Sequence, residues 1–302
     1  MANYQTIVRL RPEVREFIRN RRWVHRGDVI SYGANIRCDS FSTDGAGFRH
    51  CTFKGETLSV ADCLKRDRYG IVLGPSNVYA FGLAGNENTM PSLLAERFGF
   101  PFANVGLPEG NSRNLFSLLA AFLARAPKPP SVVLHLSGGD FTSFCYTSIA
   151  DPVFGSPNLK QIQDVLKERR GRRPDPARQM KPLLAFTSLW IGAIGNLCAS
   201  RNVPLVLGED VTFFEKAVPN EIDRQCELGK ATSPAQERQF AIHRQYVRDY
   251  HARRQAVANM LGVPLPGPSF GNDIGYIDEF HYDRQGTVDL TDHFARAIEP
   301  LL

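Results

Sequence analysis

The feature that most constrains the fold is an alternation, from Tyr69 onward, of short apolar runs with amphipathic stretches of helix length. The apolar runs are YGIVLG, PFANVG, SVVLHLSGG and VPLVLGE, and helix-like stretches such as NSRNLFSLLAAFLARA lie between them. Each run is apolar throughout, which is typical of strands buried on both faces of a parallel sheet. The pattern predicts βαβ units and an α/β domain built on a mostly parallel sheet.

Residues 1–68 lack this alternation. They contain a short amphipathic helix, predicted from Pro12 to about Arg22, and a stretch rich in turn residues over 31–68. We see no linker or repeat, so we expect an N-terminal helical and loop segment, residues 1–68, packed on one α/β domain, residues 69–302. Within that domain we expect the basic stretch Lys167–Pro182 to be an exposed loop or a partly mobile insertion. A long helix from Ser233 to Leu261 should be capped by Ser233 and ended by Gly262.

Composition and charge exclude several classes of protein. The 302 residues carry a net charge of +5, a mild excess, and the basic residues are not interleaved with aromatic ones, so we expect no nucleic-acid partner. No apolar run approaches the roughly 20 residues of a membrane helix, and the charged N-terminus does not resemble a secretory signal. The six cysteines show no metal-binding spacing. We therefore expect a cytoplasmic protein with reduced thiols, no metal and no membrane span. No G-x-G-x-x-G follows a strand, so no nicotinamide cofactor is expected, and we predict no cofactor.

Candidate site residues lie in the loops that follow the apolar runs, because ligands of open parallel sheets bind beyond the carboxyl ends of the strands. In IVLGPSNVYAFG, Ser76 follows a Gly-Pro turn at the start of a helix. A serine there is either a nucleophile presented by a tight turn or an ordinary helix cap.

Two further loops carry glycines that allow a ligand to approach the backbone. In LPEGNSRN, Gly110 and Asn111 open a helix, and in HLSGGDFTSF, Gly139 and Asp140 follow a strand. Backbone N–H groups at such turns can bind an oxyanion, and a capped helix start or a flexible turn explains the same residues.

The most specific feature lies near the C-terminus, in YIDEFHYDRQGTVDLTDHFARAI. Asp278 and His281 are three residues apart in a turn before a helix. At this spacing the carboxylate can hold the imidazole in one tautomer while the other ring nitrogen faces a serine.

Taken in order, these stretches resemble the four sequence blocks of the SGNH (GDSL-type) hydrolase superfamily. The resemblance runs from about Gly45 to the C-terminus, and element order alone supports it between Thr142 and Gly267. It implies a three-layer α/β/α domain in which Ser76 is the nucleophile, His281 the base and Asp278 the acid. It also assigns Gly110, with Gly106 as the alternative, to the oxyanion hole.

Two blocks depart from the family pattern. Pro75 replaces the aspartate of the G-D-S block, and Gly139 replaces the asparagine of the third block, which removes a side-chain amide from the oxyanion hole. Losing one such donor typically costs roughly 10²–10³ in turnover. Asn77 or Asn111 is a candidate substitute, or the backbone N–H groups of Ser76 and Gly110 suffice.

The resemblance implies acyl-ester hydrolysis or O-acyl transfer, with carbohydrate O-acetyl groups as the substrate class and acetyl-coenzyme A as a possible acyl donor. The alternative is a weakly active or inactive protein that binds an anionic glycan, a nucleotide sugar or coenzyme A in the same cleft. Two arginine-rich stretches motivate that alternative, although solvated surfaces explain them equally well. They contain Arg169, Arg170, Arg172 and Arg173, and Arg244, Arg248, Arg253 and Arg254.

Overall fold

The core of the computed structural model is a parallel sheet, as the apolar runs predict. The structure describes residues 4–22, 24–26, 29–146, 175–267 and 274–302. Within them the sheet has the order β6-β5-β7-β8, and every residue of its strands is buried. The strands are β5 (Gly70–Gly74), β6 (Phe102–Gly106), β7 (Val132–Leu136) and β8 (Leu205–Gly208). All three pairings are parallel, so the carboxyl ends of the strands meet at one edge.

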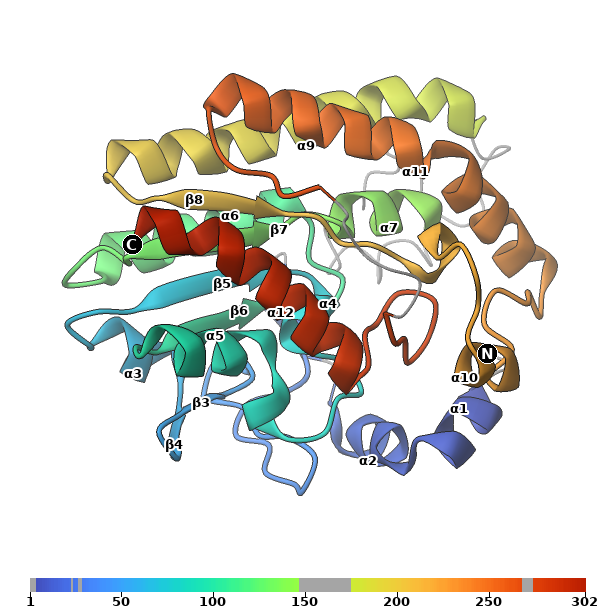
Figure 1. The fold of residues 1–302 in the computed structure, drawn as a ribbon, viewed down its shortest axis with the longest axis horizontal. Coiled ribbons are helices and arrows are strands. Elements are labelled where there is room, and N and C mark those ends of the chain that lie inside the picture. The colour runs from blue at the N-terminus through green and yellow to red at the C-terminus, as the bar shows by residue number, and fades with distance from the viewer. Residues whose placement is uncertain (1–3, 23, 27–28, 147–174, 268–273) are drawn as a thin grey trace.

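Helices cover both faces of the sheet, which completes three α/β/α layers (Figure 1). On one face, alternate strand residues such as Val72 and Leu134 pack with α5 (Met90–Phe98) and α12 (Arg284–Ile298). On the other, Ile71 and Val133 pack with α6 (Ser112–Arg125), α9 (Pro176–Ser200) and α11 (Pro234–Leu261). The predicted fold class is confirmed.

The segment ahead of the sheet is more regular than the turn-rich sequence predicts. It contains two helices, two antiparallel strand pairs and a third short helix. These elements are α1 (Tyr4–Leu10), α2 (Pro12–Asn20), β1 (Val24–Arg26), β2 (Val29–Ser31), β3 (Cys51–Phe53), β4 (Glu56–Leu58) and α3 (Val60–Leu64). Strands of three residues are too short to show a period in the sequence. The division of the chain after residue 68 stays a prediction.

The long helices test two expectations about the second half of the chain. α11 begins after Ser233, whose hydroxyl accepts the Gln236 N–H, and ends at Gly262 in the left-handed conformation, as predicted. The predicted loop over Lys167–Pro182 is wrong from Pro176, where α9 begins with Asp175 as its N-cap. Residues 167–174 lie outside the described part of the chain.

α9 is the one described helix long and apolar enough to cross a membrane by length and composition. Its residues Ile191, Ile194 and Cys198 are buried in the cluster beneath the sheet, and the helix packs along α6 and α11. Packing inside the domain therefore accounts for the third of its apolar window that is buried, whereas Leu189 is 63% exposed.

Six shorter elements complete the described order. Three are the helices α4 (Ser76–Tyr79), α7 (Gly139–Tyr146) and α10 (Glu221–Gln225). The other three are the 3-10 turns η1 (Asn86–Asn88), η4 (Phe213–Glu215), which follows β8, and η5 (Glu299–Leu301) at the C-terminus.

Candidate active site

Ser76 is the first residue of α4, directly after the carboxyl end of the central strand β5. The turn is tight because two glycines let the short helix lie against the sheet. A Cβ on Gly74 would press on Val78, and a Cβ on Gly106 would overlap the backbone of Tyr79. Gly106, the alternative oxyanion glycine, therefore serves close packing of α4 on β6.

Ser76, His281 and Asp278 form one chain of hydrogen bonds. His281 Nε2 lies 2.8 Å from Ser76 Oγ, and His281 Nδ1 lies 2.8 Å from both carboxylate oxygens of Asp278. Ser76 lies 202 residues before Asp278 in the sequence, so the fold alone brings the serine to the Asp-x-x-His turn. This is the geometry in which an imidazole can take the hydroxyl proton while the carboxylate orients the ring.

The environment favours an ionised Asp278. Burial acts to raise its pKa, but the charge of His281 and hydrogen bonds from His281 and from the amides of Phe280 and His281 outweigh burial, and the pKa is lowered. Both amides donate to Asp278 Oδ1 at 2.9 Å. The imidazole also packs on the ring of Phe81, with centroids 4.4 Å apart. Asp278 is therefore suited to stabilise a protonated His281.

Gly110 and Gly139, the predicted oxyanion residues, lie against each other. A Cβ on Gly139 would overlap the carbonyl oxygen of Gly110, so no side chain fits at residue 139 in this arrangement. The Gly110 N–H donates to Leu107 O at 3.0 Å and is thus engaged within its own turn. The amides of Ser76 and Asn77, at the start of α4, have no acceptor among the described residues.

Asn111 and Asp140, also candidate site residues, are fully buried: Asn111 at the start of α6 and Asp140 in α7 with its carboxylate on Ser112 of α6. Asn111 is the N-cap, and its Oδ1 accepts the N–H groups of Arg113 and Asn114. Asp140 accepts from the N–H and the hydroxyl of Ser112 at 2.6 and 2.8 Å, and burial raises its pKa to about 6 against these hydrogen bonds. Both side chains hold the start of α6, and Asn111 Nδ2 is buried without a hydrogen-bond partner among the described residues.

Asn77 has a partner that the sequence analysis missed. Its side-chain amide lies close enough to Asp210, which follows β8, to lower the pKa of that carboxyl, and Asp210 Oδ2 accepts the Gly138 N–H at 2.7 Å. Asp210 is buried, and burial raises its pKa to about 6 despite the opposing charge of Arg254. One carboxylate thus joins the residue beside Ser76 to the third-block loop. Its position after a strand, at the shared carboxyl edge, was the available signal.

A second buried charge cluster lies next to Asp210. His251 Nδ1 lies 2.5 Å from Glu209, and His251 Nε2 lies 2.7 Å from Glu215. Burial alone would lower the pKa of His251, but the two carboxylates raise it to about 9. Arg254 is fully buried and donates to the Gly208 carbonyl, so it is no part of the solvated basic surface that the sequence suggested. Residues 169–173 lie outside the described residues.

Metal ligation has no candidate in the part of the chain that the structure describes, where no three His, Cys, Asp or Glu residues are grouped to hold an ion. The six cysteines, all in described segments, are free thiols.

Comparison with known proteins gives matches in structure alone. No family model matches the chain. No curated protein matches it either. Solved structures similar to the chain include an inhibitor-bound aryl esterase from M. smegmatis, with 14% identity, a TM-score of 0.49 and coverage of 78% of this chain and 100% of that one.

Two more similar structures come from other bacteria. A carbohydrate acetylesterase from Sinorhizobium meliloti has 15% identity, a TM-score of 0.49 and coverage of 78% of this chain and 100% of that one. A lipolytic protein of the G-D-S-L family from Desulfitobacterium hafniense, itself described as putative, has 12% identity, a TM-score of 0.46 and coverage of 76% and 99%. The chain is thus similar to structures of esterases and of a protein assigned to the family that its sequence blocks resemble.

Proposed function

We propose that this protein is a divergent SGNH-type esterase that cleaves acyl esters through a serine nucleophile. One observation carries the proposal: the hydrogen-bond chain from Ser76 Oγ through His281 to Asp278, with contacts of 2.8 Å. A lone serine at a helix start is usually a cap, but a serine hydrogen-bonded to an imidazole that a carboxylate orients is an activated nucleophile.

The reaction follows from this arrangement. Ser76 Oγ attacks the ester carbonyl while His281 Nε2 takes the hydroxyl proton. The C–O bond to the leaving alcohol then breaks, and His281 returns the proton to that alcohol. Water, activated by the same nitrogen, attacks the acyl-serine, releases the carboxylic acid and regenerates Ser76. Asp278 stabilises the imidazolium in both halves.

The site has few hydrogen-bond donors to stabilise the oxyanion that forms during the reaction. The N–H groups of Ser76 and Asn77 are the backbone donors that the turn offers among the described residues, whereas Gly110 can contribute only if its N–H leaves Leu107 O. Residue 139 supplies no side-chain donor, and the absence of one donor corresponds to roughly 10²–10³ in turnover. We therefore expect a slow esterase.

The substrate class that we propose is a small or carbohydrate-borne O-acetyl ester, on the basis of the four sequence blocks. Hydrolysis of p-nitrophenyl acetate, and acetate release from acetylated sugars, test it in the wild type beside Ser76→Ala and His281→Ala. Ser117→Ala, at an exposed serine of α6, is the matched control. A further arm with acetyl-coenzyme A and a sugar acceptor distinguishes transfer from hydrolysis. Equal rates in wild type and Ser76→Ala would contradict the proposal.

The engaged Gly110 amide and the missing donor at residue 139 favour a second candidate, a binding protein that uses the same site without turnover. Thermal shift with coenzyme A, nucleotide sugars and anionic oligosaccharides tests it. A shift in melting temperature with one of these ligands in an inactive wild type supports the binding protein, and no shift with any of them rejects an anionic ligand.

The cytoplasmic location stays a prediction, which cell fractionation tests.

A further inference from the structure

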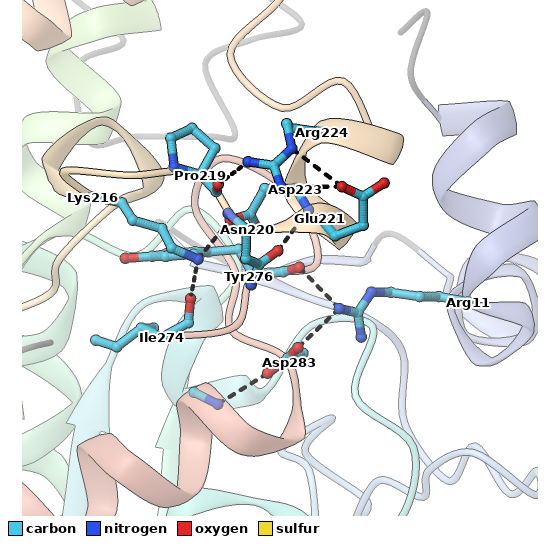
Figure 2. Close-up of polar contacts among 11 residues, drawn as sticks. Arg11, Lys216, Pro219, Asn220, Glu221, Asp223, Arg224, Ile274, Tyr276 and Asp283 are labelled. Atoms are coloured by element: carbon cyan, nitrogen blue, oxygen red, sulfur yellow. Dashed lines mark hydrogen bonds and ion pairs between the residues drawn. The ribbon is translucent and has the colours of Figure 1, made fainter. Parts of the chain in front are cut away.

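Arg11, at the junction of the N-terminal helices, points to Tyr276 and Asp283 on either side of the Asp278–His281 turn (Figure 2). Arg11 lies between α1 and α2, as the N-cap of α2. Its Nη2 donates to the carbonyl of Tyr276 at 3.2 Å and to Asp283 Oδ2 at 2.8 Å. These contacts flank the Asp-x-x-His turn on both sides.

Residues 275–283 form a short hairpin with Asp278 and His281 at its tip. The Asp283 N–H donates to Gly275 O at 3.0 Å, and the Ile277 N–H donates to His281 O at 2.7 Å. Tyr276 and Tyr282, which lie inside these two bonds along the chain, form an antiparallel β-bridge. The stem bond of Ile277 is therefore made to the backbone of His281 itself. Any shift of the stem moves the imidazole.

Asp283 is the residue at which this hairpin joins α12. Its Oδ1 accepts the Gly286 N–H at 2.9 Å and caps the helix, while Oδ2 receives Arg11. A Cβ on Gly275 would overlap the Asp283 carboxylate, so the glycine leaves the space in which this carboxylate lies across the stem. The side chains of Arg11 and Asp283 are each 15% exposed, so their ion pair is partly shielded from water.

A second cation, Lys216, binds the segment that leads into the hairpin at Ile274. Lys216 Nζ donates to the carbonyl of Ile274 at 2.9 Å and to Asp223 at 2.5 Å, and both side chains of this ion pair are almost fully buried. Figure 2 shows Lys216 and Arg11 on either side of the strand that leads into the hairpin. With Lys216 in place, loss of Arg11 leaves this segment attached but removes the hydrogen bonds that the Arg11 side chain donates to Tyr276 O and to Asp283.

We propose that Arg11 is a positioning residue for His281, holding the hairpin stem so that His281 Nε2 stays within hydrogen-bond distance of Ser76 Oγ. The N-terminal helices are then part of the site's support. The expected loss of turnover without Arg11 rests on the proposed esterase function, whereas the expected displacement of His281 does not.

The kinetic test uses Arg11→Met, with Arg15→Met as the control at an exposed position of α2. Misplacement of a reacting group by about 1 Å can cost 10²-fold, so we expect kcat for p-nitrophenyl acetate to fall by roughly 10- to 100-fold in Arg11→Met with KM nearly unchanged. The kcat of Arg11→Lys, which keeps the positive charge but lacks the planar guanidinium donors, should lie between those of Arg11→Met and the wild type. In Arg11→Ala, millimolar guanidinium should restore part of the lost kcat.

A second readout does not depend on activity. The Nδ1 proton of His281, held by Asp278, should give a downfield NMR signal that is assigned by its loss in His281→Asn. We expect this signal to shift or broaden in Arg11→Met and to remain in Arg15→Met. An inactive wild type would refute the esterase function while this signal still decides the proposal. An unchanged signal in Arg11→Met, or equal changes in Arg15→Met, overturns the positioning role.

Discussion

An asparagine at residue 139, the residue that the SGNH pattern has at this position, should damage this site. In the structure, a Cβ on Gly139 overlaps the carbonyl oxygen of Gly110 and also lies 3.2 Å from Pro75 Cβ, so any side chain forces two loops of the site apart. Overpacking of this kind typically costs about 1–3 kcal/mol. We expect Gly139→Asn and Gly139→Ala to lower the free energy of unfolding by this amount and to reduce kcat/KM.

The assay combines chemical denaturation with hydrolysis of p-nitrophenyl acetate. Gly192→Ala is the control, because a Cβ on Gly192, within α9, meets nothing within 4 Å. Alanine replaces glycine in a helix with a gain of about 0.5–1 kcal/mol, so this variant should be slightly stabilised with unchanged activity. A Gly139→Asn protein that is as stable as wild type and more active would refute the reasoning.

Two further predictions concern the buried charges beside the site. Asp210→Asn should lower kcat/KM about tenfold, because it weakens the hydrogen bond from the Gly138 N–H to this carboxylate. Asn77 lies beside Asp210, so the exchanged pair Asn77→Asp with Asp210→Asn should recover part of the loss. A double variant worse than both single variants contradicts this coupling. Because the folded-state pKa of His251 is raised to about 9 from 6.5, its stabilisation is complete below pH 6.5 and is lost as the pH rises through about 9. At pH 6 the free energy of unfolding of His251→Gln should therefore be lower than that of wild type by on the order of 2 kcal/mol, and this difference should narrow at higher pH. A difference in the free energy of unfolding that stays constant between pH 6 and pH 10 would contradict this.

Local patterns predicted the sheet and part of the site. Each strand is a continuous apolar run, and burial on both faces is visible in such a run without knowledge of its neighbours. The spacing of Asp278 and His281 is equally local, because both lie in one hairpin. Their proximity to Ser76 was expected only from the order of the sequence blocks.

Long-range partners could not be read from the sequence. Asn111 and Asp140 have side chains suited to binding a ligand or to capping a helix, and only the tertiary structure shows that they hold α6. Asp210 acquires its role from contacts with Asn77 and Gly138, which lie on two other loops. The contact of Arg11 with Asp283 spans 272 residues, and no periodicity or motif marks it.

The central claim, that Ser76 is an activated nucleophile, is tested most directly by covalent labelling. A fluorophosphonate reacts with a serine whose proton an adjacent imidazole removes, and intact-protein mass spectrometry with peptide mapping locates the adduct. The account predicts one adduct per chain, on Ser76, that is absent in Ser76→Ala and strongly slowed in His281→Ala. No adduct in the wild type, or an adduct on another serine with Ser76 unmodified, would contradict it.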